Sequence, residues 1–233
     1  MTKEQFRDLV FSIARAHGQP YLANTQVAEL DSLILEALRR FSAETKCLYS
    51  DNVTFTVNTT PAGRFDMRDT DYFTYPMLEV RRVVINGNTL PGPFSRTGPL
   101  GLEGIETDYQ DYRTGSTGTP KVWGLIPPHT LLLVPAPSAT ISNCYVSGWY
   151  LHPEMTTDQT ELSFNIEDQR AAAYCAAADL LIPYASAEGM AKIGNLMELA
   201  ERGKAQVIAR ASRLFQSGVF AERRPYRDTR IRL

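Results

Sequence analysis

The sequence predicts an α+β protein in which helices from both ends of the chain enclose a β-rich middle part. Hydrophobic residues repeat every three to four positions up to about residue 50 and again from 163 to 217, but mostly every second position over 51–162. We expect a helical hairpin at 1–50 and a helix pair at 163–217 to form one four-helix layer. An antiparallel β-sandwich or small barrel at 51–162 interrupts this layer, and an extended basic tail at 218–233 follows it.

The first 50 residues contain two predicted helices. Thr2 and Gln5 have the spacing of a capping box, and the helix that they begin ends before Gly18. Asn24 or Thr25 caps a second helix, whose apolar stripe runs over four turns at Val27, Leu30, Leu33, Ile34, Ala37, Leu38 and Phe41. The short link between the two predicts an antiparallel hairpin.

Strand patterns begin at Asp51. Val53, Phe55 and Val57 alternate with threonines, as in a half-buried strand. The same reasoning predicts strands at Met77–Ile85, Lys121–Ile126, His129–Val134 and Ile141–Leu151.

Turn signals connect these strands. Asn86-Gly87 is the preferred dipeptide of a type I′ hairpin. Prolines on both sides of His129–Val134 predict a short edge strand there. The Gly/Pro-rich stretch 90–120 exceeds ordinary loop length, and its role stays open at this point.

The second helical part begins at Asn165, a favourable N-cap, and Pro183 ends its first helix. The last helix spans about 188–216, with Gly218 as its stop. Small residues on these helices allow a neighbouring helix to approach closely, in particular Ala173, Ala177, Gly194 and Gly203.

Composition excludes several classes of protein. The chain has 233 residues, of which 43% are hydrophobic and 21% charged, so it is neither disordered nor fibrous. A formal net charge of −2 provides no global basic field for nucleic acid. Three scattered cysteines predict reduced thiols, and the charged first ten residues predict no signal peptide. The Ala-rich run at 171–185 is too interrupted to span a membrane.

No motif indicates catalysis, a cofactor or a bound metal. The chain lacks a G-x-S-x-G elbow, and its three histidines (His17, His129 and His152) have plain structural interpretations. Asp66, Asp69 and Asp71 could together coordinate a cation, but their spacing is not that of an EF-hand. The favoured interpretation of these residues is a solvated loop. A hydrolase that uses these aspartates with His129 is the least favoured alternative.

A second alternative is a binding module in the β domain. It would contact a tail protein or a carbohydrate through aromatic residues, namely Tyr72, Phe73, Tyr75 and Trp149. Half-buried sheet positions explain the same residues equally well.

The C-terminal tail is the strongest candidate for a functional segment. Five arginines alternate with residues that offer apolar contact area: Arg223, Arg224, Pro225, Tyr226, Arg227, Arg230, Ile231, Arg232 and Leu233. Arginine suits bidentate contacts, and tyrosine adds area at low entropic cost. We expect the tail to dock on another protein rather than on nucleic acid, because a platform of stacking aromatics is missing.

These features together resemble the head-to-tail adaptor (connector) proteins of tailed bacteriophages, particularly short-tailed ones. The resemblance rests on four stretches: LDSLILEA in the second helix, GTPKVWGLIPPHTLLLVPAPSA, YVSGWYLHP, and LSFNIEDQRAAAYCAAADLL followed by the loose tail. The G-x-P-x-x-W…PAP part is the most specific of them.

The resemblance implies a structural virion protein that is not an enzyme. It would be assembled in the host cytoplasm and lie at the head–tail junction, as a ring of usually twelve copies below the portal protein. Such a ring extends the DNA channel for genome packaging and ejection, without sequence-specific DNA binding or membrane contact. It also supports tail nozzle or tail-fibre proteins.

In such proteins the C-terminal segment reaches into the portal. By its position in the chain, the resemblance implies that residues 223–233 dock on the portal. Ala173, Ala177, Gly194 and Gly203 would pack neighbouring subunits, and Tyr72, Phe73 and Tyr75 are possible contacts for tail components. The long β insertion departs from the more helical members of the family.

Overall fold

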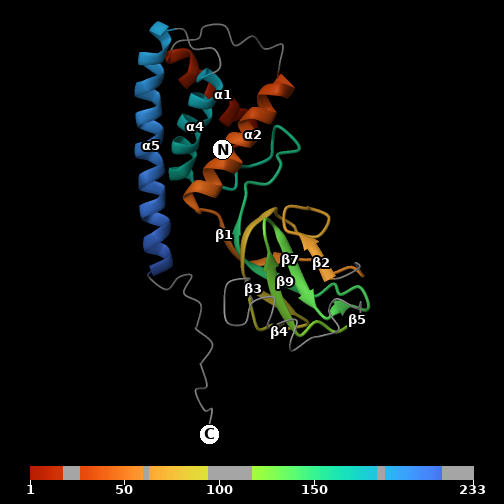
Figure 1. The fold of residues 1–233 in the computed structure, drawn as a ribbon. Helices are drawn as coiled ribbons and strands as arrows, with labels where there is room; N and C mark the ends of the chain where they lie inside the picture. Colours follow the sequence, from red (N-terminus) through yellow and green to blue (C-terminus); the bar gives the residue numbers. More distant parts are fainter. Residues whose placement is uncertain (18–26, 60–62, 94–116, 183–186, 217–233) are drawn as a thin grey trace.

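A computed structural model describes residues 1–17, 27–59, 63–93, 117–182 and 187–216. Helices occupy one end of the molecule and strands the other (Figure 1). The helices are α1 (Lys3–Ala16), α2 (Val27–Thr45), α4 (Ile166–Leu181) and α5 (Ala187–Gln216). This mixture of helices and mainly antiparallel sheets confirms the α+β class, whereas the segment boundaries at 50, 162 and 217 stay predictions.

Helix α4 is the centre of the helical unit, because α1, α2 and α5 all pack against it. Its alanines are small enough for three neighbours to approach, and Ala172, Ala173 and Ala177 are almost completely buried. The two helices of the predicted first hairpin, α1 and α2, are therefore held in place by their packing against α4 and not by contacts with each other alone. Asn165 lies at the N-cap of α4 as predicted, but its carbonyl rather than its side chain accepts the helical N–H groups.

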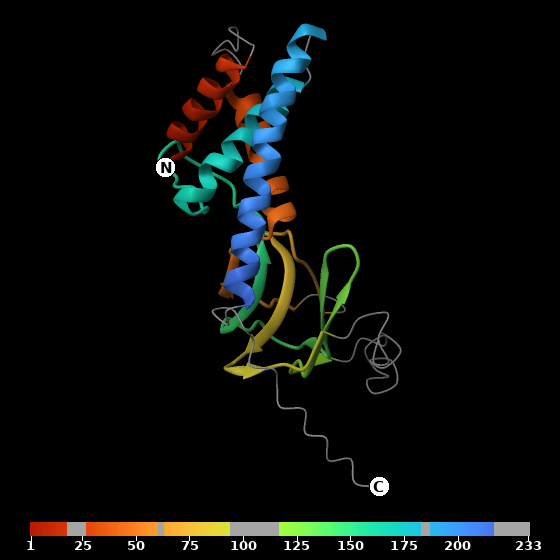
Figure 2. The same cartoon turned by 90° about the vertical axis from the view of Figure 1, so that its left-hand side faces the viewer.

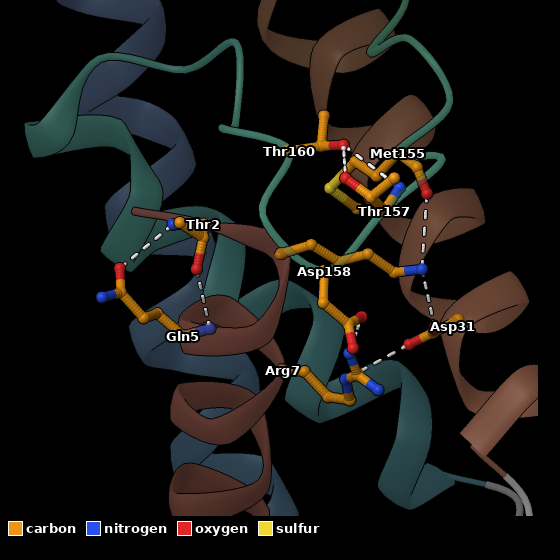
Figure 3. A network of polar contacts seen from close by, with 9 residues as sticks. Thr2, Gln5, Arg7, Asp31, Met155, Thr157, Asp158 and Thr160 are labelled. Atoms are coloured by element: carbon orange, nitrogen blue, oxygen red, sulfur yellow. Dashed lines mark hydrogen bonds and ion pairs between the residues drawn. The ribbon is translucent and has the colours of Figure 1, made fainter.

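A polar network holds α1 against its surroundings (Figure 3). The predicted capping box is present, since Gln5 N donates to Thr2 Oγ1 and Thr2 N donates to Gln5 Oε1. Lys3 and Arg7 both contact Asp31 of α2, and Arg7 also pairs with Asp158. These contacts join α1, α2 and the segment before α4, three parts of the chain that are far apart in the sequence.

The strands form two larger antiparallel sheets and one short parallel pair. The four-stranded sheet has the order β1-β9-β3-β4 and the three-stranded sheet has the order β2-β7-β6. The strands are β1 (Tyr49–Thr54), β2 (Arg64–Asp66), β3 (Met77–Ile85), β4 (Asn88–Thr89), β5 (Thr117–Gly118), β6 (Val122–Ile126), β7 (Thr130–Val134), β8 (Ala136–Pro137) and β9 (Cys144–Tyr150).

One hydrophobic core lies between the two larger sheets. Val80 and Val146 of the first sheet and Phe65, Trp123 and Leu131 of the second belong to it and are buried. Within the described residues the sheets do not join into a closed barrel, and β5 pairs with β8 in parallel, unlike the purely antiparallel arrangement expected.

The predicted hairpin is present, but one strand has a different place in its sheet than predicted. Asn86 (φ 50°) and Gly87 (φ 80°) adopt the positive φ values of a type I′ turn between β3 and β4, which confirms the hairpin. The edge position predicted for His129–Val134 is wrong, because β7 lies between β2 and β6. Strand β2 was not predicted; its Phe65 is fully buried between two polar residues.

The helical and β units meet where α2 runs into β1 and where β9 leads towards α4. His152 is completely buried at this junction: its Nδ1 is 2.8 Å from Pro153 O, and its Nε2 accepts the N–H of Ser163. Ser42 Oγ of α2 accepts the N–H of His152. Burial, opposed by the Pro153 hydrogen bond and assisted by the charge of Arg39, lowers the pKa of His152 from 6.5 to about 4.

Acid is expected to destabilise the protein through His152. Between pH 6.5 and about 4 the unfolded chain binds a proton that the folded chain excludes, so stability falls as the pH falls through this window. The loss is about 3 kcal/mol, measurable by urea unfolding at a series of pH values. His152→Gln should flatten the curve in this window, whereas the control His129→Gln should not. An unchanged curve in His152→Gln would contradict the assignment.

Candidate functional site

The predicted portal-docking segment, residues 223–233, lies outside the described residues. Its assignment therefore stays a prediction. Most of the long stretch 90–120 also lies outside them. The other predicted site residues are placed by the structure.

Of the three aromatic residues predicted to contact tail components, Phe73 is wrongly assigned. Phe73 is completely buried and stacks on Phe55, with ring centroids 4.5 Å apart, so it belongs to the β core. Tyr72 and Tyr75 are half-buried, and Tyr75 stacks on Tyr150 with centroids 4.8 Å apart. The alternation of polar and aromatic residues could have indicated an inward-facing Phe73.

The aspartates at 66, 69 and 71 form turns. Asp66 Oδ1 accepts the N–H of Arg68 at 2.9 Å, and Asp69 Oδ1 accepts the N–H of Asp71 at 2.8 Å. Within the described part of the chain, no group of three or more His, Cys, Asp or Glu side chains is placed to hold a metal. Asp66 is the last residue of β2, whereas Asp69 and Asp71 lie in the turn that follows this strand.

The small residues predicted to pack neighbouring subunits mostly pack within one subunit. Ala173 and Ala177 are completely buried. A Cβ added to Gly203 would lie 2.8 Å from Ala171 Cβ, so this glycine is needed where α5 crosses α4. Gly194 differs, because an added Cβ there would meet nothing within 4 Å. Of the four, Gly194 is the residue on an open surface, and its role between subunits stays a prediction.

The cysteines are free in the structure, as predicted. Burial raises the pKa of the Cys47, Cys144 and Cys175 thiols to about 11 in each case. A thiol with so high a pKa is a poor nucleophile at neutral pH.

Helix α5 is fixed to the start of α4 by a charged clamp. Arg210 pairs with Glu167 and with Asp168, whose side chain is only 3% exposed. Burial raises the pKa of Asp168, against the opposing influence of the Arg210 guanidinium. The clamp sets the position of the last two turns of α5, which extend beyond α4 towards the β unit (Figure 2).

Those last turns of α5 form one wall of a groove that no sequence pattern predicted. The groove has a volume of about 580 Å³, and the opposite wall comes from β1, β3 and β9. Here we call it the α5–sheet groove. Its lining includes Lys46, Tyr49, Arg81, Trp149, Ile208 and Leu214.

The sheet side of the groove carries a compact charged and aromatic cluster. Lys46 Nζ lies 5.1 Å and Arg81 Cζ 4.7 Å from the centre of the Trp149 ring. Glu79 joins the two cations, with its carboxylate oxygens 2.8 Å from Lys46 Nζ and 2.9 Å from Arg81 Nε. Lys46 (50% exposed) and Arg81 (42% exposed) carry two positive charges against the one negative charge of Glu79, so this cluster of three has a net charge of +1.

The helical unit also exposes large apolar side chains. Among the described residues they are Met1, Leu33 on α2, Ile166 and Ile182 at the two ends of α4, and Met190, Met197, Leu199, Ile208 and Leu214 on α5. The separations between Met190, Met197 and Ile208 are close to whole numbers of helical turns, so the three side chains lie along one stripe of α5. In the described residues no helix is long and apolar enough to cross a membrane.

Comparison with known proteins gives one family. The family model described as SU10 adaptor protein matches residues 5–229, nearly the whole chain. A search of curated proteins finds no match.

Proposed function

Because the chain belongs to the SU10 adaptor protein family, we propose that it forms a ring beneath the portal of a tailed bacteriophage and joins the head to the tail. Membership confirms the resemblance to phage head-to-tail adaptors that the sequence predicted. The match over 5–229 is the observation that carries the proposal, because it includes the helices, the β unit and most of the tail.

The helical unit supports the ring part of the proposal. Head-to-tail contacts between identical subunits close into a ring when two different faces of the subunit are complementary. The apolar stripe of Met190, Met197 and Ile208 on α5 is one exposed face of suitable composition. Twelve copies are expected from the family resemblance.

The charge of the chain supports a passive conduit for DNA. A net charge of −2 gives the subunit no global basic field that would hold phosphates and slow the passage of DNA. The role is structural and includes no chemical step.

The C-terminal tail supports portal docking, and the β unit supports contact with tail nozzle or fibre proteins. Tyr72 and Tyr75 stay candidates for the second contact, because both are half-buried and supported by ring contacts to Phe65 and Tyr150. The carbohydrate-binding alternative is less favoured, since Phe73 is in the core.

A phage that carries a nonsense mutation in this gene provides the test. We expect heads that package DNA but remain tailless, and restored infectivity when the wild-type protein is supplied from a plasmid. Complete, infectious particles made without the protein would contradict the proposal.

A further inference from the structure

Helix α5 takes part in two different surfaces on its opposite sides. Met197 lines a hollow that α2, α4 and α5 form together, whereas Gln206 lines a wider cleft between α4 and α5. Gln206 follows Met197 by nine positions, about two and a half helical turns, so the two side chains point in opposite directions. We call the first surface the acidic face and the second the basic cleft, after the charges that line them.

The acidic face carries exposed apolar side chains around a small hollow. Ile182 (46% exposed) and Met197 (44% exposed) line it, and the hollow itself has a volume of only about 70 Å³. Its charged lining residues have a net charge of −1, with Glu44, Asp179 and Glu201 against Arg40 and Lys204. Both cations are already paired within the subunit, Arg40 with Asp179 and Lys204 with Glu44 and Glu201. The excess charge that this face offers to a partner is therefore negative.

The basic cleft has the opposite shape and the opposite charge. Its volume is about 460 Å³, and its apolar lining residues are small: Ala171, Gly203, Val207 and Ala209. Arg210 and Arg213 against Glu167 give the lining a net charge of +1. Arg210 is held in the clamp with Glu167 and Asp168, but Arg213 makes no ion pair within the described part of the chain. Arg213 is thus available to an acidic partner.

We propose that the acidic face of one copy packs against the basic cleft of the next copy, with Ile182 and Met197 entering the cleft and Arg213 meeting the acidic residues around them. The inference rests on the proposed ring and names the two surfaces through which it closes. The exposed apolar side chains of one surface match the hollow of the other, and the two net charges are opposite.

The same charges disfavour a two-fold dimer through either surface. Such a dimer would place two acidic faces, or two basic clefts, against each other, and like charges at a contact repel. A head-to-tail contact pairs opposite charges at every interface. Because the two surfaces lie on opposite sides of α5, each copy can bind one neighbour on either side, which is the arrangement that a ring of many copies needs.

Two charge reversals test this pairing. Glu201→Lys changes the net charge of the acidic face from −1 to +1, and Arg213→Glu changes that of the basic cleft from +1 to −1. Both residues are exposed, so each variant should keep the circular dichroism and the unfolding midpoint of the wild type. Arg15→Glu and Glu154→Lys are the matched controls, because they make the same charge changes at exposed positions that line neither surface.

Assembly is measured by sedimentation velocity of the isolated protein, and as the fraction of portal rings that carry a complete ring of bound copies. We expect each reversal alone to weaken the association between copies at least tenfold, because both surfaces of that variant then have the same sign. An equimolar mixture of the two variants, and a chain with both reversals, should assemble like the wild type, since opposite charges meet again at every interface. The control variants should also assemble like the wild type.

The outcomes separate the pairing of surfaces from the adaptor role. If the single reversals assemble as well as the wild type, or if neither the mixture nor the double reversal regains assembly, the pairing is overturned while the adaptor role stands. A protein that follows the expected charge pattern in sedimentation but forms no ring on the portal would instead contradict the proposed function. A wild-type protein that stays monomeric in both measurements would overturn both.

Discussion

Removing residues 222–233 is expected to abolish binding of the protein to portal rings. The deleted part contains the five arginines from Arg223 to Arg232. Arginine forks bind carboxylates with two parallel hydrogen bonds, and Tyr226, Ile231 and Leu233 add apolar area. Co-sedimentation with purified portal rings should show a loss of at least about a hundredfold in affinity, or roughly 3 kcal/mol.

Two controls separate docking from folding. The shortened chain should keep the far-ultraviolet circular dichroism and the unfolding midpoint of the full chain. Arg202→Ala removes an exposed arginine of α5 that pairs with Glu198, and it should leave portal binding unchanged. If the shortened chain still sediments with the portal, the tail is not the docking segment.

Gly148→Ala is expected to have the largest effect on stability. Gly148 lies in β9, between β1 and β3, and an added Cβ would lie 1.9 Å from Glu79 O and 3.1 Å from Val80 Cα. Both atoms belong to the backbone of β3, so the clash cannot be relieved by turning a side chain. The strands must separate locally, and we expect a loss of about 4 kcal/mol or more, measured by urea unfolding.

Gly194→Ala is the matched control for this substitution. The added methyl group meets nothing within 4 Å, and alanine favours the helix by about 1 kcal/mol. The isolated chain should therefore be slightly stabilised. Equal stability of Gly148→Ala and the wild type would mean that β9 does not lie this close to β3.

The periodic parts of the chain were predictable because one-sided burial leaves a clear pattern. Strand β3 has the predicted bounds Met77–Ile85, and the hairpin at Asn86-Gly87 needs positive φ values that this dipeptide adopts readily. Strand β2 was not predictable in this way, since Arg64–Asp66 is too short to show alternation. Without β2, the proline-flanked β7 had no second partner and resembled an edge strand.

The groove was beyond sequence reasoning for a different reason. Lys46, Arg81, Trp149 and Leu214 come from four separate stretches, and only the packing of α5 against α4 brings the last of them near the sheet. The alanine-rich α4 was recognised as a close-packing helix, but its neighbours turned out to be helices of the same chain. Periodicity identifies a buried face without identifying which element covers it.

Electron cryomicroscopy of the protein mixed with the portal rings of its phage tests the central claim most directly. The account predicts one additional ring of density below the portal, coaxial with the channel, with helices in its wall and a segment from each subunit inserted into the portal. If the portal rings show no added density although free protein is present at a saturating concentration, the claim is contradicted.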